Sequence, residues 1–218
     1  YFIQAMKYHM ANMLTPSLYV AMNELSNHDH SRFLTRTNHM VGRVDKLGYE
    51  SASEYTNEAV MREAVIMQMT WVGAPTVYYG DEAGVCGFTD PDNRRTYPWG
   101  HENHELIAFH KDIIRIHKES EALRYGSLEI LLGEENLLAY GRFTETEKVI
   151  IIIHNRSELS EVTVPVWRAE VPMKCKMQSN IYSYEHGYKM DSEQYLVEDG
   201  EVVLNMGKYS AVVMTYKS

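Results

Sequence analysis

The feature that most constrains the fold is a change of pattern near Gly126. Beyond it the chain consists of short alternating runs separated by turn residues: "SLEILLG", "NLLAYGRF", "KVIIIIHN", "EVTVPVW", "EVVLNMG" and "YSAVVMTY". The dipeptide Asp199-Gly200, between "YLVE" and "EVVL", is typical of a two-residue hairpin turn. Short strands repeated in this way predict an all-β sandwich in the carboxyl-terminal part of the chain.

Before Gly126 the chain alternates between helical and strand-like runs, as in βα units. Helices are predicted over 2–13, over 53–71 with Ser53 as N-cap, and over 104–119, since apolar residues recur there at helical spacing. In the last helix, His110 and His117 are expected to be half-exposed. The continuous runs 18–22 and 76–79 are typical of strands buried on both faces. The predicted fold class is therefore α/β followed by all-β.

Composition limits the class of partner. Hydrophobic residues make up 44% of the chain and the net charge is −9, which favours a globular protein with a neutral partner over one that binds nucleic acid or an anionic membrane. Cys86 and Cys175 belong to no C-x-x-C pattern, so neither a zinc cluster nor a disulfide framework is indicated, and a cytoplasmic setting is expected. No run approaches the ~18 apolar residues of a membrane span.

The segment "NHDHSRF", residues 27–33, places polar side chains directly after the first predicted strand. As a metal site it would need His28 and His30 to point the same way, and the second string "HENH" has its histidines three apart, not four as the zinc motif requires. A carboxylate is harder to dismiss, because ligands bind at the carboxyl ends of parallel strands. From the residues alone, however, a solvated loop or a helix cap is the better interpretation.

Three segments together carry more information than any one of them. In order and spacing, "NHDHSRF", "GAPTVYYGDEAG" and "TDPDNRRTYPW" resemble the last strands of the α-amylase family of glycoside hydrolases, in particular its neopullulanase, cyclomaltodextrinase and maltogenic amylase branch. The resemblance covers essentially the whole chain. It implies that residues 1–124 are the carboxyl-terminal portion of a TIM (β/α)8 barrel, containing its last two βα units, and that residues 125–218 are an antiparallel β-sandwich domain.

The resemblance also implies residue roles. Members of this family are retaining enzymes that cleave α-glucosidic bonds, mainly α-1,4, with a nucleophilic Asp, a general-acid Glu and a third carboxylate that stabilises the transition state. Asp29 matches the third carboxylate, and His28 matches the neighbouring group that hydrogen-bonds sugar hydroxyls. The other substrate-binding positions implied are Asn27, Arg32, Asp90 and Arg94. Within the motif, Asn27 would orient the loop, and Arg32 would either hold a carboxylate through a bidentate pair or act as a surface charge.

Further residues of these motifs keep two interpretations. Tyr97 and Trp99 either stack on sugar faces or pack within the loop. Asp81 and Glu82 match positions that are structural more often than catalytic, so neither is expected to be the general acid. No cofactor is expected from this chain, and the calcium site of relatives would have its ligands upstream.

The resemblance also implies that something is missing. The nucleophile and the general acid lie on earlier strands of such barrels, no matching motif precedes "NHD", and the chain starts with Tyr1. We therefore expect a carboxyl-terminal piece of the enzyme that is inactive alone. Barrel strands without neighbours expose pairing edges, so this part of the chain is expected either to form a homo-oligomer or to rearrange in part. Two alternatives stay open: a non-catalytic carbohydrate-binding or assembly module, and a transglycosylase or α-1,6-glucosidase of the same family.

Overall fold

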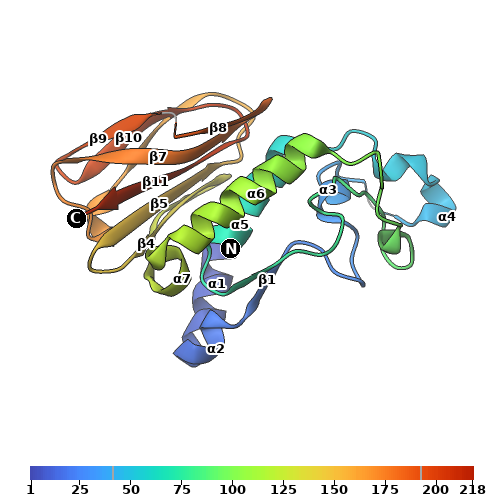
Figure 1. The fold of residues 1–218 in the computed structure, drawn as a ribbon, viewed down its shortest axis with the longest axis horizontal. Helices are drawn as coiled ribbons and strands as arrows, with labels where there is room; N and C mark the ends of the chain where they lie inside the picture. Colours follow the sequence, from blue (N-terminus) through green and yellow to red (C-terminus); the bar gives the residue numbers. More distant parts are fainter. Residues whose placement is uncertain (41, 192) are drawn as a thin grey trace.

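The computed structural model describes residues 1–40, 42–191 and 193–218. Helices, short strands and long loops make up the first part of the chain, and a β-sheet makes up the rest (Figure 1). The elements of the first part are α1 (Phe2–Ala11), α2 (Thr15–Tyr19), β1 (Met22–Glu24), α3 (Phe33–Arg36), α4 (Val44–Leu47), η1 (Glu50–Ala52), α5 (Glu58–Thr70), β2 (Ala74–Thr76), η2 (Asp92–Arg94), α6 (His104–Glu119) and α7 (Glu121–Tyr125).

The second part is antiparallel throughout. Its elements are β3 (Ser127–Glu134), β4 (Leu137–Phe143), β5 (Glu147–His154), β6 (Ser160–Val164), η3 (Val166–Ala169), β7 (Cys175–Tyr184), β8 (Gly187–Met190), β9 (Gln194–Glu198), β10 (Glu201–Met206) and β11 (Ser210–Lys217). Within the described residues the strand order is β3-β4-β5-β11-β7-β9-β10-β6, and β8 pairs with β7. The antiparallel structure expected after Gly126 is confirmed.

The sheet has an apolar core on each face. On one face, side chains of β5 and β11 such as Ile151 and Val213 join those of α5 and α6 in a first core. On the other face, Ile152 and Val212 pack with residues of β6, β9, β10 and η3 in a second core. The expected sandwich therefore differs in one respect: hydrogen bonding runs continuously from β5 through β11 to β7, so the two layers are halves of one sheet that folds over.

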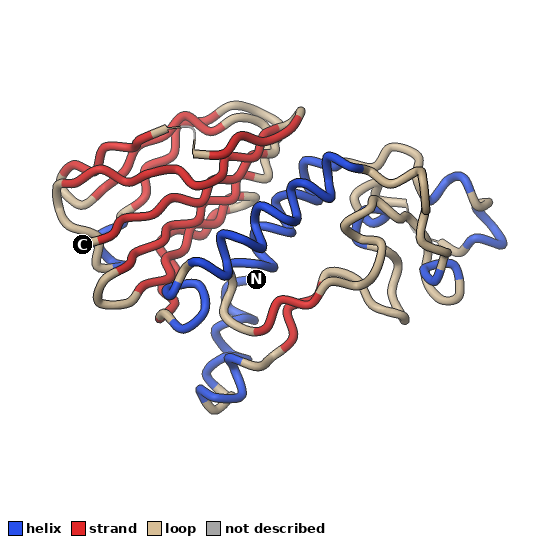
Figure 2. The backbone as a smooth tube through the Cα atoms, in the orientation of Figure 1, coloured by secondary structure: helices blue, strands red, loops and turns tan. Residues whose placement is uncertain are grey.

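Helices α5 and α6 lie beside one face of the sheet, and the loops that carry the polar motifs extend from them on the far side (Figure 2). Asn57 caps α5, its side-chain oxygen accepting hydrogen bonds from the N–H groups of Ala59 and Val60. Asn103 caps α6 in the same way. The prediction of Ser53 as the N-cap of the helix was wrong, because Tyr55 takes a φ of 57° and interrupts the helical path after η1.

The two short parallel strands hold the polar loops together. β1 pairs with β2 in the register Met22 with Ala74 and Glu24 with Thr76. The prediction of a strand over 18–22 was wrong for most of that run: Pro16 in the first turn favours the short helix α2, which ends at Tyr19, and Val20 is 71% exposed. The run 76–79 contributes only its first residue, since β2 ends at Thr76.

The expectations for the Asp199-Gly200 hairpin and for His110 have opposite outcomes in the structure. Asp199 and Gly200 have φ values of 50° and 80°, and Glu198 pairs with Glu201, so the two-residue hairpin is confirmed. The expectation of a half-exposed His110 was wrong: the ring is buried, its Nδ1 lies 2.8 Å from the carbonyl of Leu106, and burial lowers its pKa. None of the helices in the described part of the chain has both the length and the apolar character needed to cross a membrane.

Candidate active site

The segment 27–30 forms a tight turn just after β1. The side-chain oxygen of Asn27 accepts hydrogen bonds from the N–H groups of Asp29, at 3.0 Å, and His30, at 3.1 Å. This is the pattern by which Asn closes a turn on its own backbone. The Asn27 amide donates in turn to Oε1 of Glu24 at 2.7 Å, which fixes the turn to the end of β1. Asn27 thus orients the loop, as expected of its position.

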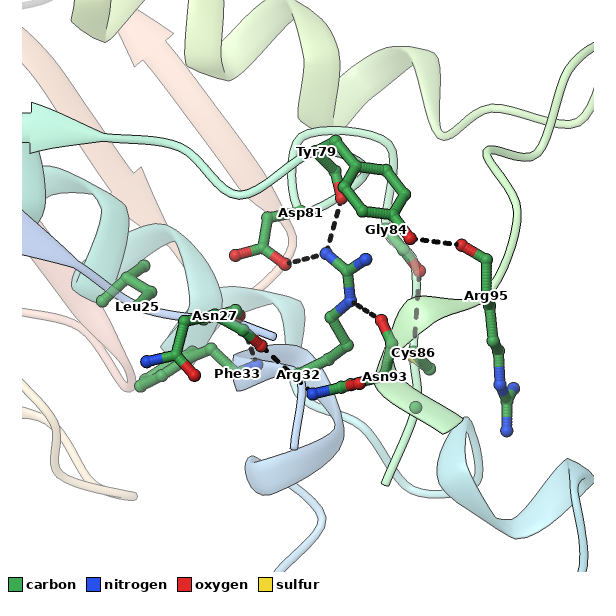
Figure 3. A network of polar contacts seen from close by, with 12 residues as sticks. Leu25, Asn27, Arg32, Phe33, Tyr79, Asp81, Gly84, Cys86, Asn93 and Arg95 are labelled. Atoms are coloured by element: carbon green, nitrogen blue, oxygen red, sulfur yellow. Dashed lines mark hydrogen bonds and ion pairs between the residues drawn. The ribbon is translucent and has the colours of Figure 1, made fainter. Parts of the chain in front are cut away.

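Arg32 is the buried centre of the loops. Its Nε donates to the carbonyl of Asn93 at 2.8 Å, and its Nη1 donates to the carbonyl of Tyr79 at 2.6 Å and to Oδ1 of Asp81 at 3.0 Å (Figure 3). The guanidinium also lies over the ring of Tyr78, 4.1 Å from its centroid. No side-chain surface of Arg32 is exposed, so the residue predicted to contact sugar is instead tied to the loop that follows β2.

Asp81 is the carboxylate that Arg32 holds. Burial raises the pKa of Asp81, while hydrogen bonds from Ser26 and Arg32 act in the opposite direction. The contact is a single hydrogen bond to Oδ1 and not the two-pronged pair that an arginine can make. It joins the segment after β1 to the segment after β2, which agrees with a structural role for Asp81.

Two side chains of the 85–95 loop bind the backbone of the turn. The amide of Asn93 donates to the carbonyls of Asn27, at 3.1 Å, and His30, at 2.8 Å. The hydroxyl of Thr89 donates to the carbonyl of Asp29 at 2.7 Å. Neither Asn93 nor Thr89 was among the predicted site residues. The sequence offers no signal for a buried amide of this kind beyond its place in "DPDNRR".

The buried frame formed by Arg32, Asp81 and Asn93 leaves His28, Asp29 and His30 exposed to solvent. The side chains of His28 and Asp29 are 62% and 67% exposed, and Nε2 of His28 lies 3.4 Å from Oδ1 of Asp29. A carboxylate next to an imidazole offers hydrogen-bond acceptors and a donor to neighbouring hydroxyl groups. A cavity of about 700 Å³ lies elsewhere, between the start of α1 and the β3–β4 turn, and these two residues do not line it. Since both side chains are largely exposed, this part of the site faces solvent directly.

Asp90 and Arg94 form an ion pair on the same side of the structure. Nε of Arg94 donates to Oδ1 of Asp90 at 2.5 Å, and both side chains are half-exposed. The hydrogen bond to Asp90 raises the pKa of Arg94, and the negative charge of Asp29 adds to the effect. The structure thus brings Asp29, Asp90 and Arg94 into one neighbourhood.

A second set of contacts, made by Asp92 and Arg95, holds the loop that carries Asp90 and Arg94. The carboxylate of Asp92 accepts from Nε of Arg95 at 3.0 Å, from Nη2 at 2.8 Å, and from the N–H of Phe88 at 2.7 Å. The Arg95 guanidinium lies 3.5 Å from the ring centroid of Tyr49. A two-pronged contact of this kind holds a loop in one geometry.

Two aromatic residues lie further along the same loop. The rings of Tyr97 and Trp99 are 4.5 Å apart between centroids, and Trp99 is 79% exposed. Their mutual contact is packing, and the open face of Trp99 leaves the stacking interpretation available. Within the described residues, no three His, Cys, Asp or Glu side chains come together in a way that could hold a metal ion.

Comparison with known proteins decides the family. Residues 1–122 match the family model described as "Alpha amylase, catalytic domain". The chain belongs to the α-amylase family. Among curated members, the chain is 30% identical over 217 residues to an amylopullulanase of Thermoanaerobacter thermohydrosulfuricus, a match that covers 91% of this chain and 13% of the relative. It is 36% identical over 141 residues to a cyclomaltodextrinase of Thermoanaerobacter pseudethanolicus, covering 64% of this chain and 22% of the relative.

The fold agrees with that of solved α-amylase-family enzymes. An α-amylase from Anoxybacillus superposes with a TM-score of 0.75 at 22% identity, over 99% of this chain and 41% of that one. The resemblance read from the three motifs is thereby confirmed, and the chain spans a small fraction of the length of the curated α-amylase-family relatives it matches. The catalytic role of each named residue stays a prediction.

Proposed function

We propose that this chain supplies the transition-state-stabilising carboxylate, Asp29, to a retaining glycoside hydrolase that cleaves α-glucosidic bonds. The observation that carries the proposal is the buried frame of Arg32, Asp81 and Asn93, which fixes the 27–30 turn while leaving Asp29 and His28 facing solvent. A rigid loop that presents a carboxylate and an imidazole side by side is suited to gripping the hydroxyls of a neutral sugar.

The chemistry gives Asp29 a specific task. Glycoside hydrolysis passes through an oxocarbenium-like transition state in which the sugar ring flattens. Contacts to hydroxyls near the reacting carbon that tighten as the ring flattens lower the barrier, because they are stronger in the transition state than in the bound substrate. Asp29 accepts such hydrogen bonds, His28 donates one beside it, and Asp90 with Arg94 bind sugar units further from the bond that is cleaved. Arg32 and Asn27 act by holding the turn.

The architecture is proposed on the same footing. Residues 1–124 correspond to the carboxyl-terminal portion of a (β/α)8 barrel, and residues 125–218 to a separate β-domain. The parallel pairing of β1 with β2 and the chain-long similarity to a solved α-amylase support this division. Among the described strands, β1 and β2 pair only with each other, so association through their outer edges, with a second copy or with the remainder of a barrel, stays a prediction.

The substrates proposed are maltooligosaccharides, cyclodextrins or pullulan, with α-1,4 bonds as the main target. The relatives called cyclomaltodextrinase and amylopullulanase support this class. Because the chain spans 13% and 22% of those relatives, we propose that the nucleophile and the general acid are supplied by the rest of such an enzyme, and that these 218 residues alone give no measurable turnover.

Binding of an unhydrolysed sugar tests the proposal on the chain as it stands. We expect maltotriose or acarbose to shift the NMR signals of His28, Asp29, Asp90 and Arg94, and Asp29→Asn to weaken binding. Asp45→Asn, at an exposed aspartate on α4, is the matched control and should bind as the unchanged chain does. Shifts confined to other parts of the chain would contradict the proposal. Turnover of any of these sugars that Asp29→Ala abolishes would contradict the expected inactivity.

A further inference from the structure

One buried amide group holds both ends of the turn that carries Asp29. The Nδ2 atom of Asn93 donates to the carbonyl of Asn27, which precedes His28 and Asp29, and to the carbonyl of His30, which follows them. The distances are 3.1 and 2.8 Å, both within the normal range for N–H···O bonds. No part of Asn93 is exposed. The residue therefore cannot contact substrate, and any effect it has on the site passes through the turn.

The two contacts require a group that donates two hydrogen bonds, and the amide of Asn93 is such a group. Both partners are carbonyl oxygens, which only accept, so the group between them must offer two N–H donors at one atom. The opposite orientation of the amide would bring its own oxygen against the two carbonyls. The Oδ1 atom has no hydrogen-bond partner among the described residues, so donation to the turn is the contact that this side chain makes.

The amide is also prevented from moving away. Arg32 donates to the backbone carbonyl of Asn93 at 2.8 Å. Gly87 packs against the other side so closely that a Cβ there would lie 2.5 Å from the carbonyl oxygen of Asp92 and 2.9 Å from the Cα of Asn93. The position of Asn93 is therefore set by Arg32 and by the packing of Gly87, in addition to its own hydrogen bonds to the turn.

A second contact from the same loop supports the middle of the turn. The Thr89 hydroxyl donates to the carbonyl of Asp29 at 2.7 Å. The carbonyls of Asn27, Asp29 and His30 are thus all bound by side chains of the 89–93 segment. The N–H groups of Asp29 and His30 are bound within the turn, by the side chain of Asn27.

We propose that Asn93 is a positioning residue, which sets the location of Asp29 and His28 by holding the two carbonyls on either side of them. Thr89 assists by holding the carbonyl between. The inference rests on the proposed function only for what Asp29 does once it is placed. The rest of the inference concerns structure alone: the turn keeps its geometry because side chains about 60 residues further along the chain donate hydrogen bonds to it.

Amide hydrogen exchange, followed by NMR, tests this without any sugar. Asn93→Asp keeps the shape of the side chain and replaces the two donors with an acceptor. We expect exchange at Asp29 and His30 to become roughly tenfold faster or more, because their bonds to Asn27 persist only while the turn does. Exchange in β5 and β11 should stay within about twofold of the unchanged chain.

Exchange of the Asn93→Asp variant measured at several pH values distinguishes hydrogen-bond donation by residue 93 from simple filling of space. At acid pH the introduced carboxyl becomes protonated and can again donate one hydrogen bond. The ratio of exchange rates between the variant and the unchanged chain should therefore narrow as the pH falls. A ratio that is independent of pH would overturn the inference, because a residue that merely fills space has no reason to titrate.

Thr89 provides a milder pair of variants in case Asn93→Asp fails to fold. Thr89→Val removes the hydroxyl and keeps the shape, and Thr89→Ser keeps the hydroxyl. We expect faster exchange at Asp29 in the valine variant only, and equal rates in both variants would count against the inference. The exchange experiments contain no sugar, so they test the positioning role separately from the proposed function. If the exchange rates change as expected but sugar does not bind near Asp29, the proposed function is contradicted and the positioning role stands.

Discussion

Arg32 and Arg94 both lie in the loops around the 27–30 turn and differ in what surrounds them. Arg32 has no exposed side-chain surface and makes hydrogen bonds to two carbonyls and to Asp81. The Arg94 side chain is 50% exposed, and its one ion pair with a described residue is with Asp90. Burial changes what an ion pair contributes. An exposed pair is worth little, but a buried charge that loses its partner is left without compensation.

Replacing each arginine with methionine separates the two cases. We expect Arg32→Met to lower the free energy of unfolding by about 3 kcal/mol, because it strands the buried carboxyl of Asp81 and two carbonyl oxygens. Arg94→Met should cost less than about 1 kcal/mol. Urea unfolding of both variants measures the difference, and equal losses would contradict the assignment of Arg32 as the centre of the frame.

Glu63 predicts a pH dependence of stability. Its carboxyl is buried on α5, and burial raises its pKa from 4.5 to about 8. Between these values the unfolded chain has released the proton that the folded chain keeps, so this group lowers the free energy of unfolding by about 1.4 kcal/mol per pH unit as the pH rises. The stability that the chain has with Glu63 protonated is fully present at acid pH and is lost as the pH rises through about 8.

Glu63→Gln should remove this slope. We expect the variant to be more stable than the unchanged chain near pH 8 and to show a flatter dependence on pH in urea unfolding. Glu105→Gln, at an exposed position on α6, is the control and should leave the slope as it was. A Glu63→Gln variant that keeps the full slope would show that another group carries it.

Sequence reasoning named the exposed residues of the candidate site and two of its buried ones, Arg32 and Asp81, but it did not name the buried Asn93. His28, Asp29, Asp90 and Arg94 lie in short motifs whose order and spacing could be compared with a family, and the structure places them near one another. Asn93 gives no such signal, since its two acceptors lie more than 60 residues earlier in the chain and are backbone atoms. Sequence patterns report side-chain chemistry and not the carbonyls that a side chain will meet.

At the scale of elements, Arg142 joins the helices to the sheet. From β4 its Nη1 donates to the carbonyl of Thr70, the last residue of α5, and its Nη2 donates to the carbonyl of Gly126, just after α7. A cation at the end of a helix offsets the unpaired carbonyls there. Burial lowers the pKa of Arg142 to about 10, so the guanidinium is still charged at neutral pH.

Arg142→Met should loosen α5 before it loosens the sheet. We expect a loss of about 3 kcal/mol in the free energy of unfolding, since the carbonyls of Thr70 and Gly126 lose their donor. Hydrogen exchange should speed up more in the last turn of α5 than in β5. Arg168→Met, which breaks a partly exposed pair with Glu129, is the control and should cost less than about 1 kcal/mol.

One helix with a clear pattern was predicted well, and one strand without a pattern was missed. Helix α6 has the predicted bounds, because its apolar residues recur at helical spacing beside a polar face. β7 was overlooked although it is long and central. Two of its inward positions are Ser179 and Ser183, both buried, so the alternation of apolar and polar residues that identifies a strand is absent from its sequence.

At the scale of the whole molecule, stability is unevenly distributed. The first core spans α5, α6 and the sheet, so these elements share one set of contacts. Helices α1, α2 and α4 bury none of their residues. These helices contribute only partly buried side chains to the first core, such as Met10 of α1 and Leu18 of α2, whereas α5 and α6 are part of the same packed unit as the strands.

Hydrogen exchange across the whole chain should show this division. We expect amides of α5, α6, β5 and β11 to exchange through one common opening with the largest protection, and amides of α1, α2 and α4 to exchange earlier. Urea dependence of exchange distinguishes the two classes, since global opening is steeply dependent on denaturant and local opening is not. A separate, less stable opening for α5 and α6 would contradict the shared core.

All eight residues of β5 are buried, and four of them in a row are isoleucines, Ile150–Ile153. When one face of a strand is polar, a slip of one residue costs its whole apolar contact. Here a slip would only exchange one isoleucine for another between two equally apolar cores. The correct register must therefore be set at the ends of the strand. There Glu147 accepts hydrogen bonds from Ser120 and Ala122, and His154 contacts Ser160 and Gly207. In β5, hydrogen bonds at the two ends determine the register, because the apolar residues would fit a shifted register as well.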